Sequence, residues 1–411
     1  MENMPFAYSA LFRTDLPPPA QPYNGFPKYN FVGGHNDADS TPVEGLIAAA
    51  TAVLQREGRS LATYGLDSGP LGYRPLREFL AAKLERTAGI AATADQILVT
   101  SGSLQGLDLI NQVLVARGDT VVIEDATYGG VLTRLKRIGA NIIGVPLDRE
   151  GMRMDALAAT LEQLKSQGVA PRYIYTIPTV QNPTGSIMPV ARRAELIRLA
   201  AAHHVPIVED ECYSDLVWAG TRPPALMAMS DMAHVIHVGS FSKSIAPALR
   251  VGYIAAGWEV LSRLLSVKSD AGSGALEQMV VAEYCVRHFD EHIAGLSRTL
   301  EGKLDVLIEA LGEQFGTAAE FERPAGGIFL WVRLPETVDT TRLAQVALTA
   351  GIAINPGVEW SIDPLAGKRS LRICFAHPSK QTLRAGVQSL AEVCHREMGV
   401  PARIANVERS K

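Results

Sequence analysis

Short apolar runs alternate with amphipathic stretches of helical length along the middle of the chain. Runs rich in β-branched residues predict strands, and apolar residues that recur every three or four positions predict helices. The predicted strands are residues 97–100, 120–123, 141–146, 173–177, 206–208 and 235–238, and the predicted helices between them are residues 103–116, 130–138, 155–167 and 190–203. This alternation indicates an α/β fold with a mostly parallel central sheet that helices cover on both faces.

The pattern differs on either side of this region. The first thirty residues predict an extended arm, and helices follow near Pro42 and Leu76. After residue 257 the predicted elements are helices over 275–314 with a break near Phe289, strands over 328–334 and 371–375, and helices over 341–350 and 380–398. We therefore expect residues 1–60 to form an arm and part of a small domain, residues 61–288 a large domain, and residues 289–411 a C-terminal small α+β domain.

Composition narrows the class of protein. The 411 residues are 47% apolar and 20% charged, which is enough for more than one globular domain, and the net charge is only −4. No block of like charges indicates a nucleic acid or a membrane surface as partner, and no stretch resembles a secretory signal or a membrane span. The four cysteines are scattered and lack the spacing of a zinc site or a disulfide framework. These features predict a cytoplasmic protein whose partners are small molecules and which binds no metal.

One stretch combines a lysine, two serines and a nearby arginine. Ser240, Ser242 and Lys243 follow an apolar run, and Arg250 precedes a second one. A lysine amine can condense with an aldehyde as a Schiff base, while an arginine fork and hydroxyl groups can hold a phosphate. Pyridoxal 5'-phosphate carries both an aldehyde and a phosphate. Taken alone, the stretch is also compatible with a surface lysine in a polar turn.

The ends of the other predicted strands supply further candidate groups. Gly102, Ser103 and Leu104 can present backbone N–H groups to a phosphate where a helix begins, although Ser103 could simply cap that helix. Tyr128 could stack on a pyridine ring or be a core tyrosine. Asn182 could direct its amide at a phenolic oxygen or only form a turn.

Three acidic residues follow the strand at 206–208, and only one of them suits the site. A carboxylate beside the pyridine nitrogen keeps that nitrogen protonated. Asp210 is favoured over Glu209 and Glu211 because side chains alternate along a strand, and because Tyr213, three residues later, could then reach the phenolic oxygen of the same ring.

Together these motifs resemble those of the class I/II aminotransferases, which are fold type I pyridoxal-phosphate enzymes. The similarity is closest to the branch of aminoadipate, aromatic and kynurenine aminotransferases, and it extends from about residue 31 to about residue 398. The matching motifs are Tyr64-Gly65 with Gly69, Gly102-Ser103, Tyr128, Asn182-Pro183-Thr184-Gly185, Asp210 with Tyr213, Ser240-Phe241-Ser242-Lys243 with Arg250, and Arg372.

The resemblance implies roles for individual residues and a homodimer. Lys243, Asp210 and Tyr128 would be catalytic, as the Schiff-base lysine, the partner of the pyridinium nitrogen and the stacking ring. Further residues implied to bind the cofactor are Tyr64, Gly102, Ser103, Leu104, Asn182, Tyr213, Ser240, Ser242 and Arg250, and those implied to bind substrate are Gly34, His35, Asn182 and Arg372. Tyr64 would reach the phosphate in the neighbouring subunit. The implied reaction moves an amino group between an L-amino acid and a 2-oxo acid.

Two departures from the family pattern leave alternatives open. Leu104 stands where this branch often has glutamine, so it can offer only its backbone N–H. In the loop that normally covers the substrate side chain, many relatives have a proline after the glycine, where this chain has His35-Asn36-Asp37. His35 could bind a substrate carboxylate or hydroxyl, or be structural. The same cofactor also supports racemases, β-lyases and decarboxylases, and a non-catalytic domain that senses it is a further alternative.

Overall fold

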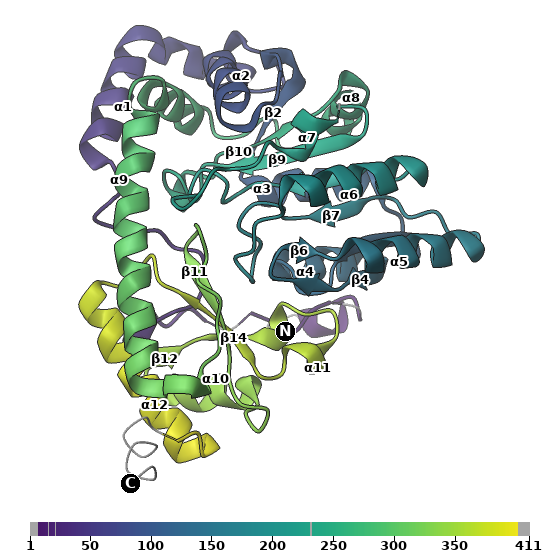
Figure 1. Cartoon of the computed structure of the whole chain (residues 1–411). Helices are drawn as coiled ribbons and strands as arrows, with labels where there is room; N and C mark the ends of the chain where they lie inside the picture. Colours follow the sequence, from purple (N-terminus) through teal and green to yellow (C-terminus); the bar gives the residue numbers. More distant parts are fainter. Residues whose placement is uncertain (1–6, 15, 21, 231, 402–411) are drawn as a thin grey trace, which may run out of the picture.

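The computed structural model describes residues 7–14, 16–20, 22–230 and 232–401. A larger part, built on a seven-stranded sheet, and a smaller part, built on three strands, lie at the two ends of one long helix, α9 (Ala275–Phe315) (Figure 1). No helix in the described part of the chain is long and apolar enough to cross a membrane.

The large sheet has the parallel arrangement that the sequence predicts. Its strand order is β2 (Ile97–Thr100), β10 (Gly252–Ala255), β9 (Val235–Ser240), β8 (Ile207–Asp210), β7 (Ile174–Thr176), β3 (Thr120–Glu124) and β4 (Asn141–Val145). Only β10 runs antiparallel to its two neighbours. The carboxyl ends of β3, β7, β8 and β9 therefore meet at one edge, where open α/β sheets bind their ligands.

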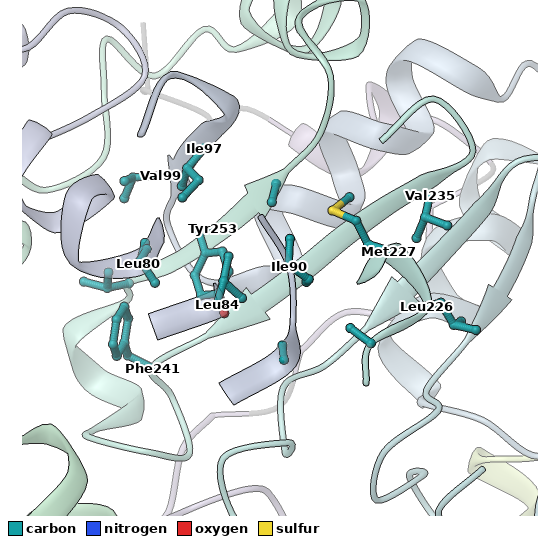
Figure 2. Packing of buried hydrophobic residues seen from close by; sticks show 14 of the residues in the cluster. Leu80, Leu84, Ile90, Ile97, Val99, Leu226, Met227, Val235, Phe241 and Tyr253 are labelled. Atoms are coloured by element: carbon teal, nitrogen blue, oxygen red, sulfur yellow. The ribbon is translucent and has the colours of Figure 1, made fainter. Parts of the chain in front are cut away.

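Alternating side chains pack helices on both faces of this sheet. Val99 packs in a core cluster with α2 (Arg74–Ala88), whereas its neighbour Leu98 packs in a different cluster. The cluster around Val99 also contains buried residues of α5 (Met154–Ser166), α6 (Val190–Ala202) and α7 (Leu226–Met229). The cluster around Leu98 contains residues of α3 (Ser103–Leu114), α4 (Gly129–Ile138) and α8 (Trp258–Val267). Figure 2 shows Leu80 and Leu84 of α2 beside Val99 and Tyr253 in the first of these clusters.

The smaller part is built around an antiparallel sheet with strand order β11 (Phe329–Arg333), β14 (Ser370–Cys374) and β13 (Asn355–Pro356). Helices α10 (Thr340–Thr349) and α12 (Lys380–Met398) share a hydrophobic cluster with it. Strand β1 (Tyr29–Asn30) pairs in parallel with β12 (Ile352–Ala353), so the N-terminal segment joins this part of the protein. Consequently, the loop at Gly33 and Gly34 lies between the two parts.

The prediction of a helix break near Phe289 is wrong, because α9 is continuous from Ala275 to Phe315. Phe289 is buried and packs edge-on against Phe79 and Phe241, with ring centroids 5.5 Å and 6.3 Å away. An aromatic residue on the buried face of a helix does not interrupt it, and the sequence has no proline there. The other long helices and the strands of the large sheet lie within a few residues of their predicted positions.

Candidate active site

A cavity of about 280 Å³ lies beyond the carboxyl ends of the parallel strands. It contains most of the side chains that the sequence singled out. The predicted site residues that line it are Gly34, Ser103, Leu104, Tyr128, Asn182, Asp210, Tyr213, Ser240, Ser242, Lys243, Arg250 and Arg372. Residues separated by more than three hundred positions in the chain thus converge on one site.

Lys243 lies in the turn that follows β9. Its Nζ donates a hydrogen bond to the carbonyl oxygen of Gly34 at 2.6 Å, and its own carbonyl accepts one from Asn36 Nδ2 at 3.3 Å. Burial lowers the pKa of the Lys243 ammonium, and the positive charges of Arg372 and Arg250 act in the same direction. A depressed pKa favours the neutral amine, which is the nucleophilic form.

Asp210 is the last residue of β8 and is buried. Tyr175 Oη donates to its Oδ2 at 2.8 Å, whereas its Oδ1 is buried without a partner among the described residues. Burial raises the pKa of this carboxyl group. A cationic N–H group placed at Oδ1 would satisfy that oxygen and stabilise the ionised carboxylate.

The neighbouring acids of Asp210 are engaged elsewhere, as alternation along the strand predicts. Glu209 Oε1 lies 2.9 Å from His237 Nδ1, and Glu211 accepts a hydrogen bond from Thr179 Oγ1 at 2.8 Å. Neither glutamate lines the cavity. The choice of Asp210 among the three acids therefore agrees with the geometry.

A second group of residues forms an anion-binding corner at the start of α3. Gly102, with φ of 76°, is the N-cap of this helix, so Ser103 occupies the first helical position and is not its cap. A Cβ atom at Gly102 would collide with the guanidinium of Arg250, which explains the glycine there. Arg250 Nη2 donates to the carbonyl of Ser101 at 3.1 Å. A helix N-terminus, a guanidinium and the hydroxyls of Ser240 and Ser242 suit a phosphate group.

On another wall of the cavity, Asn182 links Tyr213 and Arg372. Asn182 Nδ2 donates to Tyr213 Oη at 3.2 Å, and its Oδ1 accepts from Arg372 Nη1 at 3.2 Å. Arg372 is buried, and its hydrogen bonds within the described residues go to neutral acceptors on Asn182, Gly33 and Asn355. Burial lowers the pKa of its guanidinium, although arginine stays protonated in proteins. A buried cation whose hydrogen bonds within the described residues all go to neutral groups fits the binding of an anionic ligand.

Glu124, at the end of β3, holds the segment that carries Asn182. Its Oε1 accepts hydrogen bonds from Thr176 Oγ1 at 2.6 Å and Ile177 N at 3.2 Å, and its Oε2 accepts one from Gln181 Nε2 at 3.0 Å. The Gln181 side chain also accepts from the backbone N–H of Thr184 at 2.9 Å. The buried glutamate thereby fixes the turn around Asn182 without lining the cavity itself.

Replacing Glu124 should change how stability depends on pH. Burial raises the pKa of Glu124 to about 7, even though four donors surround it. A carboxyl group whose pKa is raised on folding gives stability that is present below its unfolded pKa and is lost as pH rises through the folded value. Relative to the Glu124→Gln variant, the wild type should lose about 3 kcal/mol of unfolding free energy between pH 4.5 and pH 8. Urea unfolding at several pH values measures this difference, and a difference that stays constant with pH would show that Glu124 does not titrate in this range.

Three predicted residues, Tyr64, His35 and Gly102, do not line the cavity. Tyr64 is 89% exposed and borders a separate hollow of about 800 Å³. The ring of His35 packs against Phe26 and His377, with centroids 5.1 Å and 5.6 Å away. Its part in substrate binding stays a prediction. Gly102 contributes through its backbone position behind Arg250, since it is not itself in the lining.

Several residues that line the cavity were not predicted from the sequence. These are Gly33, Ile177, Cys212, Pro247, Asn355 and Trp360. Cys212 could have been found, because it lies two residues after Asp210 and so follows the same alternation. Asn355 and Trp360 come from short irregular segments of the small part, where no periodicity marks an element.

The cavity fits pyridoxal 5'-phosphate. The unpaired Oδ1 of Asp210, the amine of Lys243 and the anion-binding corner at Gly102 and Arg250 match a ring nitrogen, an aldehyde and a phosphate respectively. Each of these groups lies in the lining or directly behind it, and the buried guanidinium of Arg372 remains for an anionic substrate.

Comparisons with known proteins agree with this geometry. Residues 29–390 match the family model of aminotransferase class I and II. The chain is 32% identical over 372 residues to aromatic-amino-acid aminotransferase 1 of Thermococcus litoralis, covering 90% of this chain and 88% of that protein.

Two solved structures are also similar. The multiple substrate aminotransferase of Thermococcus profundus is 33% identical, with a TM-score of 0.84 over 90% of this chain and 92% of the other. LysN, the α-aminoadipate aminotransferase of Thermus thermophilus, was solved in complex with N-(5'-phosphopyridoxyl)-L-leucine. It is 29% identical, with a TM-score of 0.83 over 91% of this chain and 93% of the other.

Proposed function

The chain belongs to the class I and II aminotransferases, and on that premise we propose that Lys243, Asp210 and Arg372 carry out its reaction. The protein is a pyridoxal-phosphate-dependent enzyme that moves an amino group between an L-amino acid and a 2-oxo acid. The family model and the similar aminotransferases do not favour the alternatives of a racemase, β-lyase, decarboxylase or non-catalytic sensor. The observation that carries the residue assignment is the convergence of an amine, a carboxylate and a buried guanidinium in one cavity.

The cofactor supplies an aldehyde that binds the amino group and a pyridine ring that withdraws electrons from the substrate carbon. Asp210 would accept a hydrogen bond from the ring nitrogen at Oδ1 and keep that nitrogen protonated. Ser103, Ser240, Ser242 and Arg250 would hold the phosphate, together with the backbone N–H groups at the start of α3. Tyr128 would contact the ring, and Tyr213 and Asn182 would bond its phenolic oxygen.

Lys243 would hold the cofactor covalently through its Nζ. The same amine, when free, would be the base that takes up the proton of the substrate Cα and the acid that returns it. Burial lowers the pKa of this amine, which increases the fraction of the neutral form that can act as a base. Arg372 binds the substrate carboxylate and orients the Cα–H bond toward the lysine.

A half-reaction screen tests the proposed function. Each of a panel of amino acids is added to the holoenzyme, and the absorbance of the bound cofactor is followed together with the release of 2-oxo acid. At least one amino acid should bleach the band and release one equivalent of its oxo acid. Release of D-amino acid, or of pyruvate with ammonia, without amino transfer would contradict the assignment.

We further propose that the active unit is a homodimer and that its site includes a residue from the partner. Tyr64 is almost fully exposed although the family pattern gives it a role at the phosphate. Exposed aliphatic side chains occur on α1 (Val43–Glu57), on the segment after it, where Leu61 lines the same hollow as Tyr64, and on α9. They are Val43, Ile47, Leu54, Leu61, Leu276 and Val286. Such a surface is typical of a covered interface.

The dimer makes a prediction about Tyr64. Replacing Tyr64 by Phe removes a hydroxyl from the partner's phosphate site, so the Kd for pyridoxal phosphate should rise roughly tenfold, the effect of one hydrogen bond to a charged group. Light scattering should show a dimer for both the wild type and the variant. A monomeric wild type with full activity would contradict the shared site.

We also propose a cytoplasmic location and a division of the chain into domains. All four cysteines are free thiols, which supports a location in the reducing cytoplasm. For the division into residues 1–60, 61–288 and 289–411, separate hydrophobic clusters support a large and a small part. Within the first segment, Phe31 belongs to the cluster of the small part, whereas Ala49 and Val53 belong to a cluster of the large part.

A further inference from the structure

Trp360 lines the active-site cavity and carries a buried hydrogen-bond donor for which the described residues supply no acceptor. The residue lines the cavity and is only 6% exposed. Its indole Nε1 is buried and has no hydrogen-bond partner within the described ranges of the chain. Buried polar groups in folded proteins are almost always paired, so an unpaired donor in a ligand cavity calls for an explanation.

The backbone around Trp360 is fixed against the large part of the protein. Its carbonyl oxygen accepts a hydrogen bond from the backbone N–H of Thr127 at 2.8 Å. The ring centroid of Trp360 lies 6.1 Å from that of Tyr128, which follows Thr127 in the sequence. The indole is therefore held between the large part and Arg372 and is not a loose surface side chain.

Arg372, which packs against Trp360, also has a buried N–H group without a partner among the described residues. Its Cζ lies 4.0 Å from the ring centroid of Trp360 and 5.3 Å from that of Phe329. Aromatic rings pack against the guanidinium, and its N–H groups donate hydrogen bonds within the plane of the group. Nη1 donates to Asn182 and Nη2 donates to Gly33 and Asn355, but Nε is buried without a partner among the described residues.

We propose that Trp360 is a substrate-binding residue whose indole N–H, together with the Nε–H of Arg372, binds the carboxylate common to the amino acid and the 2-oxo acid. The inference rests on the proposed function and adds a residue to its substrate site. A carboxylate has two oxygens that each accept more than one hydrogen bond, so one such group can satisfy both donors. The indole ring also fixes the plane of the guanidinium, which sets the orientation of the carboxylate.

The Trp360→Phe variant separates the donor from the ring. Phenylalanine keeps an aromatic face for Arg372 but removes the N–H. Binding of propionate, a carboxylate without an amino group, to the holoenzyme is measured by titration calorimetry. The Kd should rise roughly tenfold, the loss expected for a hydrogen bond to a charged group. KM should rise by a similar factor for both the amino acid and the oxo acid, with kcat within about twofold and the cofactor absorbance unchanged.

Trp218 provides a matched control. Its Nε1 is also buried without a partner among the described residues, but it packs beside the hydrophobic cluster of the small part and does not line the cavity. Trp218→Phe should leave the Kd for propionate and both KM values at their wild-type levels. An equal loss of affinity in both variants would overturn the proposal, because the effect would then be unspecific.

A second substitution at position 360 guards against a folding defect. Trp360→His retains a ring N–H, so its Kd for propionate should lie closer to that of the wild type than to that of Trp360→Phe. If Trp360→Phe does not fold, Trp360→His decides by itself: a Kd within threefold of the wild type supports the donor, on the roughly tenfold scale of one such bond, and a larger loss contradicts it. Wild-type affinity in a folded Trp360→Phe would overturn the inference while leaving the proposed function intact, since that function fails only if the wild type does not transfer amino groups.

Discussion

The Lys243→Ala variant is expected to lose at least about 10⁴-fold of its turnover with amino acids, because one side chain supplies both the covalent attachment and the base. The structure supports this double role. The Lys243 amine lies in the cavity with Asp210 and Arg372, and burial lowers its pKa. Steady-state release of oxo acid measures the loss.

The variant should still bind the cofactor, but without a covalent bond. The anion-binding corner at Gly102 and Arg250 and the carboxylate of Asp210 do not depend on the lysine side chain. Lys165→Ala, at an exposed position on α5, is the matched control and should behave as the wild type. Near-wild-type turnover of Lys243→Ala would remove the basis of the assignment.

Replacing Arg372 by alanine should have the second-largest effect. The variant loses the buried cation that we assign to the substrate carboxylate and leaves the Oδ1 of Asn182 without that donor. Truncating one member of a buried charge pair costs several kcal/mol, so kcat/KM should fall roughly 10²- to 10³-fold. The fall should appear for the amino acid and for the oxo acid, since both carry the carboxylate.

Two comparisons make the Arg372 result specific. Arg372→Lys keeps a positive charge but not the planar fork, so it should recover only part of the lost activity. Arg333→Ala removes an exposed arginine from the neighbouring strand β11 and should have no effect. A loss confined to one of the two substrates would contradict an anchor for the group that they share.

The parts of the site that follow from strand ends could be predicted from the sequence. Parallel strands bring their carboxyl ends to one edge, and side chains alternate along each strand, so these two rules are enough to separate Asp210 from Glu209 and Glu211. In the structure Asp210 lines the cavity, whereas the two glutamates bond to His237 and Thr179. For this part of the site, local rules along the chain are sufficient.

Residues that depend on packing between distant segments could not be predicted. Trp360 enters the cavity from an irregular turn, and its place beside Arg372 depends on the docking of that turn against Thr127. His35 follows Gly34 in the sequence, yet its ring packs against Phe26 and His377 and leaves the lining. In each case the position of the side chain is set by a tertiary contact that has no counterpart in local periodicity.

The assignment of Lys243 can be tested directly by reducing its bond to the cofactor so that the attachment becomes permanent. The holoenzyme is reduced with borohydride, digested and analysed by peptide mass spectrometry to find the residue that carries the phosphopyridoxyl group. We predict that the modification lies on Lys243 and disappears when substrate amino acid is added before the reductant. Modification of a different lysine, with Lys243 recovered unmodified, would contradict the assignment of Lys243 as the Schiff-base residue.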